Sequence, residues 1–232
     1  MDIVITNNKF EGVGKTNILL ARLKNVTVSN NVFHNFKLDA IRVEGGYNFG
    51  EWLFENNKFE NDEVQAHNGI YLQSVSGIED TTYQKITITN NTFKNIGDST
   101  SESSYNCAIS IRTYQEKGLT LEITYNNFEN CINYFNLRNN GADSATFACS
   151  INYNKFKGVP SGVYHRNIRP GSNDTASSNP PLTTMDYNLF LDSEGAVLAD
   201  LSQFADKFLD LSDQSNKNNY ATKEEYEEMI RS

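Results

Sequence analysis

A short motif that returns seven times constrains the fold of this chain more than any other feature. The motif is apolar-x-apolar-x-x-Asn-x-Phe, and residues 86–93, ITITNNTF, are its clearest copy. Its Asn is Asn8, Asn31, Asn57, Asn91, Asn126, Asn154 and Asn188, and its Phe is Phe10, Phe33, Phe59, Phe93, Phe128, Phe156 and Phe190. Within each copy apolar and other residues alternate with a period of two, which predicts strands and argues against helices.

The spacing of the copies predicts a solenoid. Successive Phe residues are 23 to 35 positions apart, which indicates a coil of fixed size that carries loops of variable length. A second apolar pair follows each Phe, at Ile18/Leu20, Ile41/Val43, Ile70/Leu72, Ile109/Ile111 and Phe135/Leu137, with weaker copies around Val163 and Val197. We therefore expect two strands per coil, stacked in parallel on the coils before and after.

The motif Asn is expected to form the corner of each coil. Asn tolerates the left-handed conformation that a sharp corner needs, and its amide can bond to the same Asn one coil above and below. A second turn residue stands two positions past each Phe, at Gly12, Asn35, Asn61, Asn95, Asn130, Gly158 and Asp192.

These residues carry a family resemblance. The Asn-x-Phe corner in short coils resembles the right-handed parallel β-helix, or pectate-lyase-like, superfamily, which includes polysaccharide lyases, phage tailspikes and bacterial surface proteins. The resemblance implies an all-β, right-handed parallel β-helix solenoid of about seven coils over residues 1–198. It indicates the fold and does not fix an activity.

Residues 199–232 are expected to cap the last coil with helices. Thr222 and Glu225 form a capping box for a short helix at about 223–231. Before it, apolar residues recur at helical spacing, at Leu201, Phe204, Phe208 and Leu211. At the other end the first motif begins at Ile3, and we expect further N-terminal coils or a partner domain to cover that end.

Composition excludes two classes of partner. The formal net charge is −9, and no run of Lys or Arg occurs, which argues against nucleic acid and anionic membranes. No apolar stretch is long enough to span a membrane, and no signal peptide is evident. Cys107, Cys131 and Cys149 are expected to be buried apolar residues, with one disulfide as the alternative. The family resemblance implies an extracellular, cell-surface or virion location.

The outward positions of the second strands are the candidate binding surface, because long loops flank them. If the coils are in register, these positions bring together Arg112, Arg138 and Arg166, with Tyr71, Gln73 and Tyr114 near them. Guanidinium groups bind carboxylates and aromatic rings pack on sugar rings, so this combination suits an acidic polysaccharide. The alternative is a solvated face whose arginines pair with nearby acids.

Catalytic and metal-binding candidates are fewer. Tyr164 and His165 lie in the segment YHRNIRPGSND, where either could abstract a proton, although a lone His in a strand is also compatible with a structural role. Glu44 and Asp62 belong to an acidic patch that could hold Ca²⁺ through carboxylate oxygens, with a solvated surface as the alternative. No other cofactor is expected.

Two functions follow as hypotheses. The first is a carbohydrate-facing module, binding or adhesive, of a larger extracellular, cell-surface or phage-tail protein. The alternative is the C-terminal part of a polysaccharide lyase that acts on a uronate glycan, although the motifs of polygalacturonases and of the best-known pectate lyases do not occur here. A purely structural spacer is a third reading.

Overall fold

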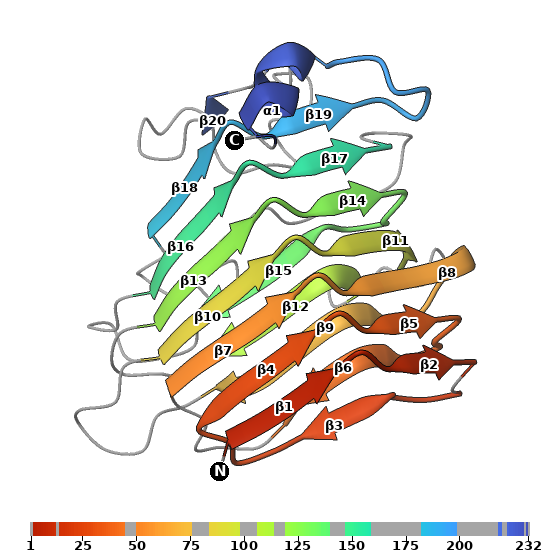
Figure 1. Ribbon diagram of the computed structural model, residues 1–232, viewed down its shortest axis with the longest axis vertical. Helices are drawn as coiled ribbons and strands as arrows, with labels where there is room; N and C mark the ends of the chain where they lie inside the picture. Colours follow the sequence, from red (N-terminus) through yellow and green to blue (C-terminus); the bar gives the residue numbers. More distant parts are fainter. Residues whose placement is uncertain are drawn as a thin grey trace.

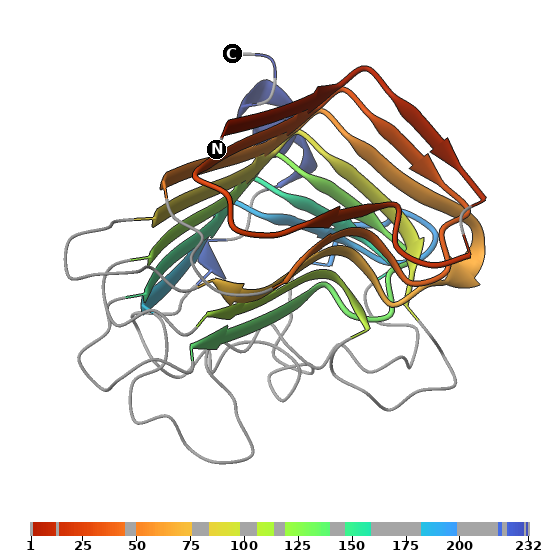
Figure 2. The same cartoon turned by 90° about the horizontal axis from the view of Figure 1, so that it is seen from below.

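The chain folds as a right-handed parallel β-helix, as the sequence predicted. The computed structural model describes residues 2–12, 14–44, 50–75, 84–97, 106–113, 119–139, 147–158, 182–198, 218–219, 222–229 and 231. In Figure 1 each coil runs from left to right at the front and returns at the back while it climbs towards the C-terminus. Seen along the axis, three sheets enclose the core as the sides of a triangle (Figure 2).

The first sheet, sheet A, contains the apolar-x-apolar part of the motif. All its strand pairs are parallel, and the apolar positions align from coil to coil, as in Ile3↔Val26 and Ile86↔Leu121. In spatial order its eight strands are β1 (Asp2–Thr6), β4 (Asn25–Ser29), β7 (Gly50–Glu55), β10 (Gln84–Thr89), β13 (Leu119–Thr124), β16 (Phe147–Asn152), β18 (Leu182–Asp186) and β20 (Asn218–Asn219).

The second sheet, sheet B, contains the motif Phe. Its seven strands are β2 (Lys9–Glu11), β5 (Val32–His34), β8 (Lys58–Gln65), β11 (Thr92–Ile96), β14 (Asn127–Glu129), β17 (Lys155–Lys157) and β19 (Leu189–Leu191). Complete coils therefore have three strands, and the expectation of two was wrong. Most of these strands have only three residues, too few for a period of two to be recognised in the sequence.

The third sheet, sheet C, contains the second apolar pairs. Its strands are β3 (Ile18–Leu20), β6 (Asp39–Val43), β9 (Asn68–Val75), β12 (Cys107–Thr113) and β15 (Phe135–Asn139), and all of them pair in parallel. The weaker copy around Val163 lies outside the described residues. The copy around Val197 was wrongly predicted, because Val197 makes an antiparallel bridge back to Leu191 of its own coil.

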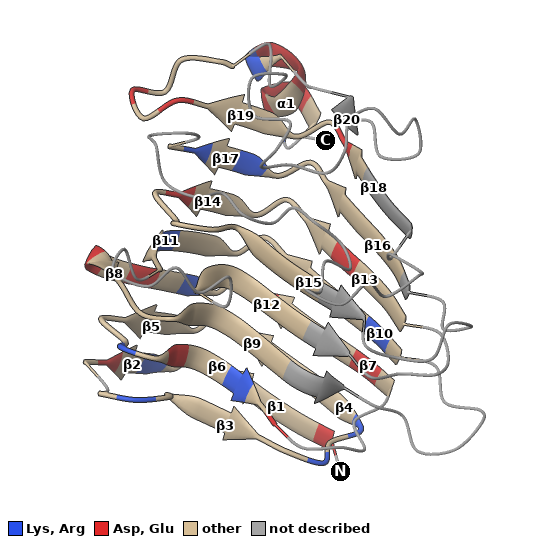
Figure 3. Ribbon diagram, turned by 180° about the vertical axis from the view of Figure 1, so that it is seen from behind, with Lys and Arg blue, Asp and Glu red and all other residues tan. Residues whose placement is uncertain are grey.

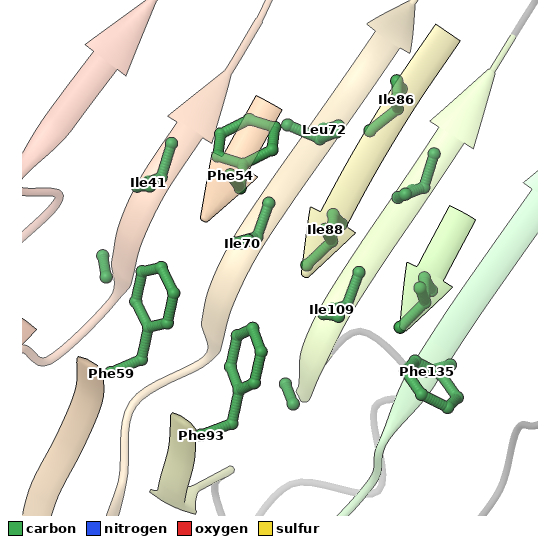
Figure 4. Close-up of a cluster of buried hydrophobic side chains, with 14 of the residues drawn as sticks. Ile41, Phe54, Phe59, Ile70, Leu72, Ile86, Ile88, Phe93, Ile109 and Phe135 are labelled. Atoms are coloured by element: carbon green, nitrogen blue, oxygen red, sulfur yellow. The ribbon is translucent and has the colours of Figure 1, made fainter. Parts of the chain in front are cut away.

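The core consists of columns of identical or similar side chains. The seven motif Phe rings stack face to face along the whole rod, with successive ring centroids 4.8 to 5.0 Å apart, which is the coil spacing. Figure 4 shows Ile and Leu side chains from sheets A and C in the same core as Phe59, Phe93 and Phe135. The three cysteines are buried and free, so the disulfide alternative is wrong. Burial raises the pKa of Cys131 to about 12.

The motif asparagines form the predicted ladder. In each of the first six coils, the backbone N–H and the Nδ2 of the motif Asn both donate to Oδ1 of the motif Asn in the next coil, as Asn91 does to Asn126 at 2.9 and 3.0 Å. The same Nδ2 atoms, from Asn31 to Asn188, donate to backbone carbonyls of the preceding coil. Buried amides are thus hydrogen-bonded at every level.

The left-handed residue at this corner is not the motif Asn, contrary to the prediction. It is the residue before it, with φ between 54° and 59°, at Asn7, Asn30, Asn56, Asn90, Tyr125, Tyr153 and Tyr187. The second turn was predicted correctly in five coils, where Gly12, Asn35, Asn95, Asn130 and Gly158 have positive φ. In the third coil the left-handed residue is Ala66, which lets β8 extend to eight residues.

The two ends of the rod differ. At the first coil the inward residues Ile3, Ile5 and Phe10 are only partly buried. At the last coil the helix α1 (Lys223–Met229) lies beside β19 (Figure 1). Its Tyr226 packs on Leu189 and Leu191. Its predicted capping box is present, since Glu225 N donates to Thr222 Oγ1 and Thr222 N to the Glu225 carboxylate. The helix predicted at 201–211 lies outside the described residues.

Candidate functional site on sheet C

The outward side of sheet C carries a row of polar side chains in register. Arg42 of β6 pairs with Tyr71 of β9, Tyr71 with Ser110 of β12, and Ser110 with Asn136 of β15. These residues alternate with the inward apolar pairs of the same strands, so the row is a direct product of the two-residue period of a strand. In the first coil the same position is the apolar Leu19, which pairs with Arg42.

Most of this row is shielded from water, although it lies on the outer side of the sheet. Leu19 is 62% exposed, whereas Tyr71 is 9%, Asn136 4% and Ser110 1% exposed. Asn136 Nδ2 donates to Ser110 Oγ at 3.5 Å, within the shielded part. Side chains this buried do not contact a ligand themselves, and they support the neighbouring positions of the sheet through hydrogen bonds.

Arg42 is neutralised within the chain. Its Nη1 lies 3.0 Å from Oδ2 of the buried Asp39, its guanidinium also pairs with Glu44, and the same group lies 4.8 Å above the ring of Tyr71. Asn68 Nδ2 donates to the other oxygen of Asp39 at 2.7 Å. Burial of the guanidinium lowers its pKa, but the bonds to Glu44 and Asp39 outweigh burial and raise it. Arg42 therefore fixes the ring of Tyr71 and is not a free cation.

Two members of the predicted arginine row, Arg112 and Arg138, are in register at the level of the backbone. The Cα partner of Arg112 is Gln73 on one side and Arg138 on the other, and β12 shifts register against β9 directly after Arg112. The side chains of these three residues lie outside what the structure describes. Arg166, Tyr114, Tyr164 and His165 also lie outside the described residues, so their roles stay predictions.

The two metal candidates belong to different contacts. Glu44 pairs with Arg42 beside sheet C, whereas Asp62 of β8 bonds to His34 and Asn35 on sheet B. Within the described ranges, no group of three or more His, Cys, Asp or Glu side chains is arranged to hold a metal ion. A calcium ion stays a prediction.

Sequence reasoning missed a histidine that links three coils. His34 Nδ1 lies 2.7 Å from Glu11 Oε1, and its Nε2 lies 3.0 Å from Asp62 Oδ1. The hydrogen bond to Glu11 and then that to Asp62 raise the pKa of His34, while partial burial opposes them. The pKa of Glu11 is lowered, first by Lys9 and then by His34, and that of Asp62 is lowered by Asn35 and His34. The signal was present in the repeat, because Glu11 and His34 both directly follow a motif Phe.

The position directly after the motif Phe carries alternating charges along sheet B. From the first coil to the sixth, the residue after the motif Phe is Glu11, His34, Glu60, Lys94, Glu129 and Lys157, all in register. Lys94 and Lys157 lie 3.6 and 3.8 Å from the same oxygen of Glu129. Figure 3 shows this change of sign between β14 and β17. Exposed pairs of this kind stabilise by at most about 1 kcal/mol each, so we assign them a structural role.

Sequence reasoning also missed a tyrosine column at the corner between sheets A and B. Tyr125, Tyr153 and Tyr187 have φ values of 57°, 58° and 56°, at the position where the first four coils have Asn. A left-handed residue other than Gly or Asn costs roughly 1–2 kcal/mol. A stacked aromatic pair returns about 0.5–1.5 kcal/mol, and three residues form only two pairs. Stacking therefore does not offset the backbone strain. Strained backbone conformations of this kind cluster at functional sites.

Comparison of the chain with protein-family models, with curated proteins and with solved structures found no match. Among the described residues, no helix has the length and apolar character needed to cross a membrane.

Proposed function

We propose that this chain is a carbohydrate-facing β-helix module that binds an acidic polysaccharide along sheet C, as part of an extracellular, cell-surface or virion protein. The observation that supports it is the register of Gln73, Arg112 and Arg138, one coil apart, beside the polar row that starts at Arg42. A linear polymer with one carboxylate per sugar is complementary to cations repeated at the coil spacing.

Electrostatics favours an anionic ligand for this row. Arg112 and Arg138 are Cα partners on adjacent strands, and like charges so placed repel each other unless an anion lies between them. Arg42 has Asp39 and Glu44 as its anions, so the chain itself shows how this face neutralises a guanidinium. We propose that a uronate or sulfate group of the ligand does the same for Arg112 and Arg138.

The proposal is tested by the retention of the purified chain on alginate, pectate, chondroitin and neutral glycans. Arg138→Ala and Arg112→Ala should each weaken binding to an acidic glycan roughly tenfold, the loss expected for one charge-assisted hydrogen bond. Lys58→Ala is the matched control, because it removes one cation from the exposed side of sheet B. Melting temperatures of all three variants should equal that of the unchanged chain.

Three outcomes separate the hypotheses. Retention that Lys58→Ala weakens as much as Arg138→Ala would show general charge attraction and would contradict a site on sheet C. Growth of near-ultraviolet absorbance on a uronate polymer would reveal unsaturated products and favour the lyase hypothesis, with Tyr164 and His165 as the first residues to change. Neither retention nor turnover on any glycan would favour a structural spacer.

A further inference from the structure

The corner between sheets A and B carries a second surface with the features of a ligand site. Each coil contributes one outward side chain there, four asparagines followed by Tyr125, Tyr153 and Tyr187. Tyr125 and Tyr187 are 40% and 43% exposed, which makes them two of the few large exposed hydrophobic side chains among the described residues. We call these three residues the tyrosine column.

The tyrosine column is a regular array of phenol groups. The ring centroids of Tyr125 and Tyr153 are 5.2 Å apart and those of Tyr153 and Tyr187 5.5 Å, with interplanar angles of 8° and 6°. Because the rings stack on each other, they present their edges and hydroxyl groups outward. Within the part of the chain that the structure describes, none of the three hydroxyls has a hydrogen-bond partner.

Apart from Leu189, which is buried against Tyr226, the flanking residues are polar, and together they carry no net charge. On the side of sheet A, the residues directly before the tyrosines are Thr124, Asn152 and Asp186. On the side of sheet B, the nearest outward residues are Asn127 and Lys155, which are Cα partners. One acid and one base flank three phenols, so neither an anionic nor a cationic polymer has an electrostatic advantage here.

We propose that the tyrosine column binds a neutral glycan whose chain runs along the axis of the rod. An extended glycan repeats its hydroxyl groups at a spacing close to that of the coils, so each sugar can meet one phenol. Tyrosine combines apolar contact area with a hydrogen-bonding tip, and the neighbouring amides and hydroxyls add fixed polar partners. This site is separate from sheet C and does not depend on the function proposed there.

The chain supplies a suitable substitution for the test. Tyr153→Asn introduces the residue that the first four coils use at the same corner and the same φ, so it removes the central ring and also relieves backbone strain. The variant should melt at or above the temperature of the unchanged chain. Val4→Asn is the matched control, because it removes a 69% exposed apolar side chain from the outer side of β1, away from the tyrosines.

The experiment is affinity electrophoresis of the unchanged chain, Tyr153→Asn, Val4→Asn and Arg138→Ala in gels that contain soluble xylan, glucomannan or hydroxyethylcellulose, with pectate as a separate arm. We expect a neutral glycan to retard the unchanged chain, Val4→Asn and Arg138→Ala equally, and to bind Tyr153→Asn at least roughly tenfold more weakly, as expected for a central aromatic contact. Loss of pectate binding in Arg138→Ala alone concerns sheet C and not this site.

Other outcomes would overturn the inference. No retardation by any neutral glycan, or equal weakening in Val4→Asn and Tyr153→Asn, would show that the column is not a glycan site. Sedimentation velocity tests whether the tyrosine column contacts a second copy of the chain instead. A dimer that Tyr153→Asn converts to a monomer would show that it does.

Discussion

Replacement of one ladder asparagine tests the physical account of the rod. Asn126 lies in the fifth coil, where its Oδ1 accepts from N and Nδ2 of Asn91, and its Nδ2 donates to the carbonyls of Ile88 and Thr124. Asn126→Ala removes these bonds and leaves the buried N–H of Asn91 without an acceptor. One orphaned buried donor costs about 1–3 kcal/mol and each of the three further lost bonds about 1 kcal/mol, so we expect a loss of about 4–6 kcal/mol.

The control for this experiment is the next residue in the chain. Asn127→Ala makes the same chemical change one position along, where the side chain is half-buried on the outward side of β14 and has no hydrogen bond to a described residue. It should cost less than about 0.5 kcal/mol.

Urea unfolding is followed by far-ultraviolet circular dichroism and by the fluorescence of Trp52, the single tryptophan, which is buried in β7. Two probes are needed because coils of a solenoid can unfold separately. Equal losses for the two variants would refute the claim that the ladder stabilises the rod.

Three further predictions concern the core and the surface. Gly69→Ala places a Cβ 2.8 Å from a backbone oxygen and 2.9 Å from the ring of Phe93, so it should lower the free energy of unfolding by about 1–3 kcal/mol. The Cβ of Gly14→Ala meets nothing within 4 Å, so this control should leave the melting temperature unchanged. Ile123→Asp buries an unpaired charge at a fully inaccessible core position and should abolish cooperative melting; an unchanged melting temperature would contradict its place in the core. The raised pKa of His34 means that its stabilisation is complete below its unfolded-state pKa of about 6.5 and is lost as the pH rises through the folded-state value. The melting temperature of the unchanged chain should therefore fall as the pH rises through the folded-state pKa of His34, and that of His34→Gln should fall less. Parallel curves of melting temperature against pH would contradict the contacts of His34 with Glu11 and Asp62.

The columns of the rod could be predicted from the sequence, because equivalent positions in successive copies of the motif stack on each other. The stacking of the motif Phe residues and the asparagine ladder both follow from the spacing of the motif. The left-handed residue was misassigned because the first four copies contain two consecutive asparagines, such as Asn90 and Asn91, and either one suits a corner. The last three copies, in which Tyr precedes the Asn, show that only the second asparagine is common to all.

The candidate site was less predictable than the fold. Alternation along a strand tells which side of a sheet a residue faces, so the row from Arg42 to Asn136 could be read from the sequence. Whether an outward residue is accessible depends on tertiary packing, and Tyr71 at 9% exposure was therefore not foreseen as shielded. The pairing of Arg42 with Asp39 depends on side-chain positions that no periodicity specifies.

The asparagine ladder also gives the rod an electrical direction. From the first coil to the last, Nδ2 of each ladder asparagine donates to Oδ1 in the next coil, and none of these six bonds runs the other way. The amide dipoles are therefore aligned and polarise one another, as peptide dipoles do in a helix. The direction leaves Oδ1 of Asn8 as the acceptor that faces away from the second coil, so a coil or partner group that continues the ladder on that side has to supply a hydrogen-bond donor.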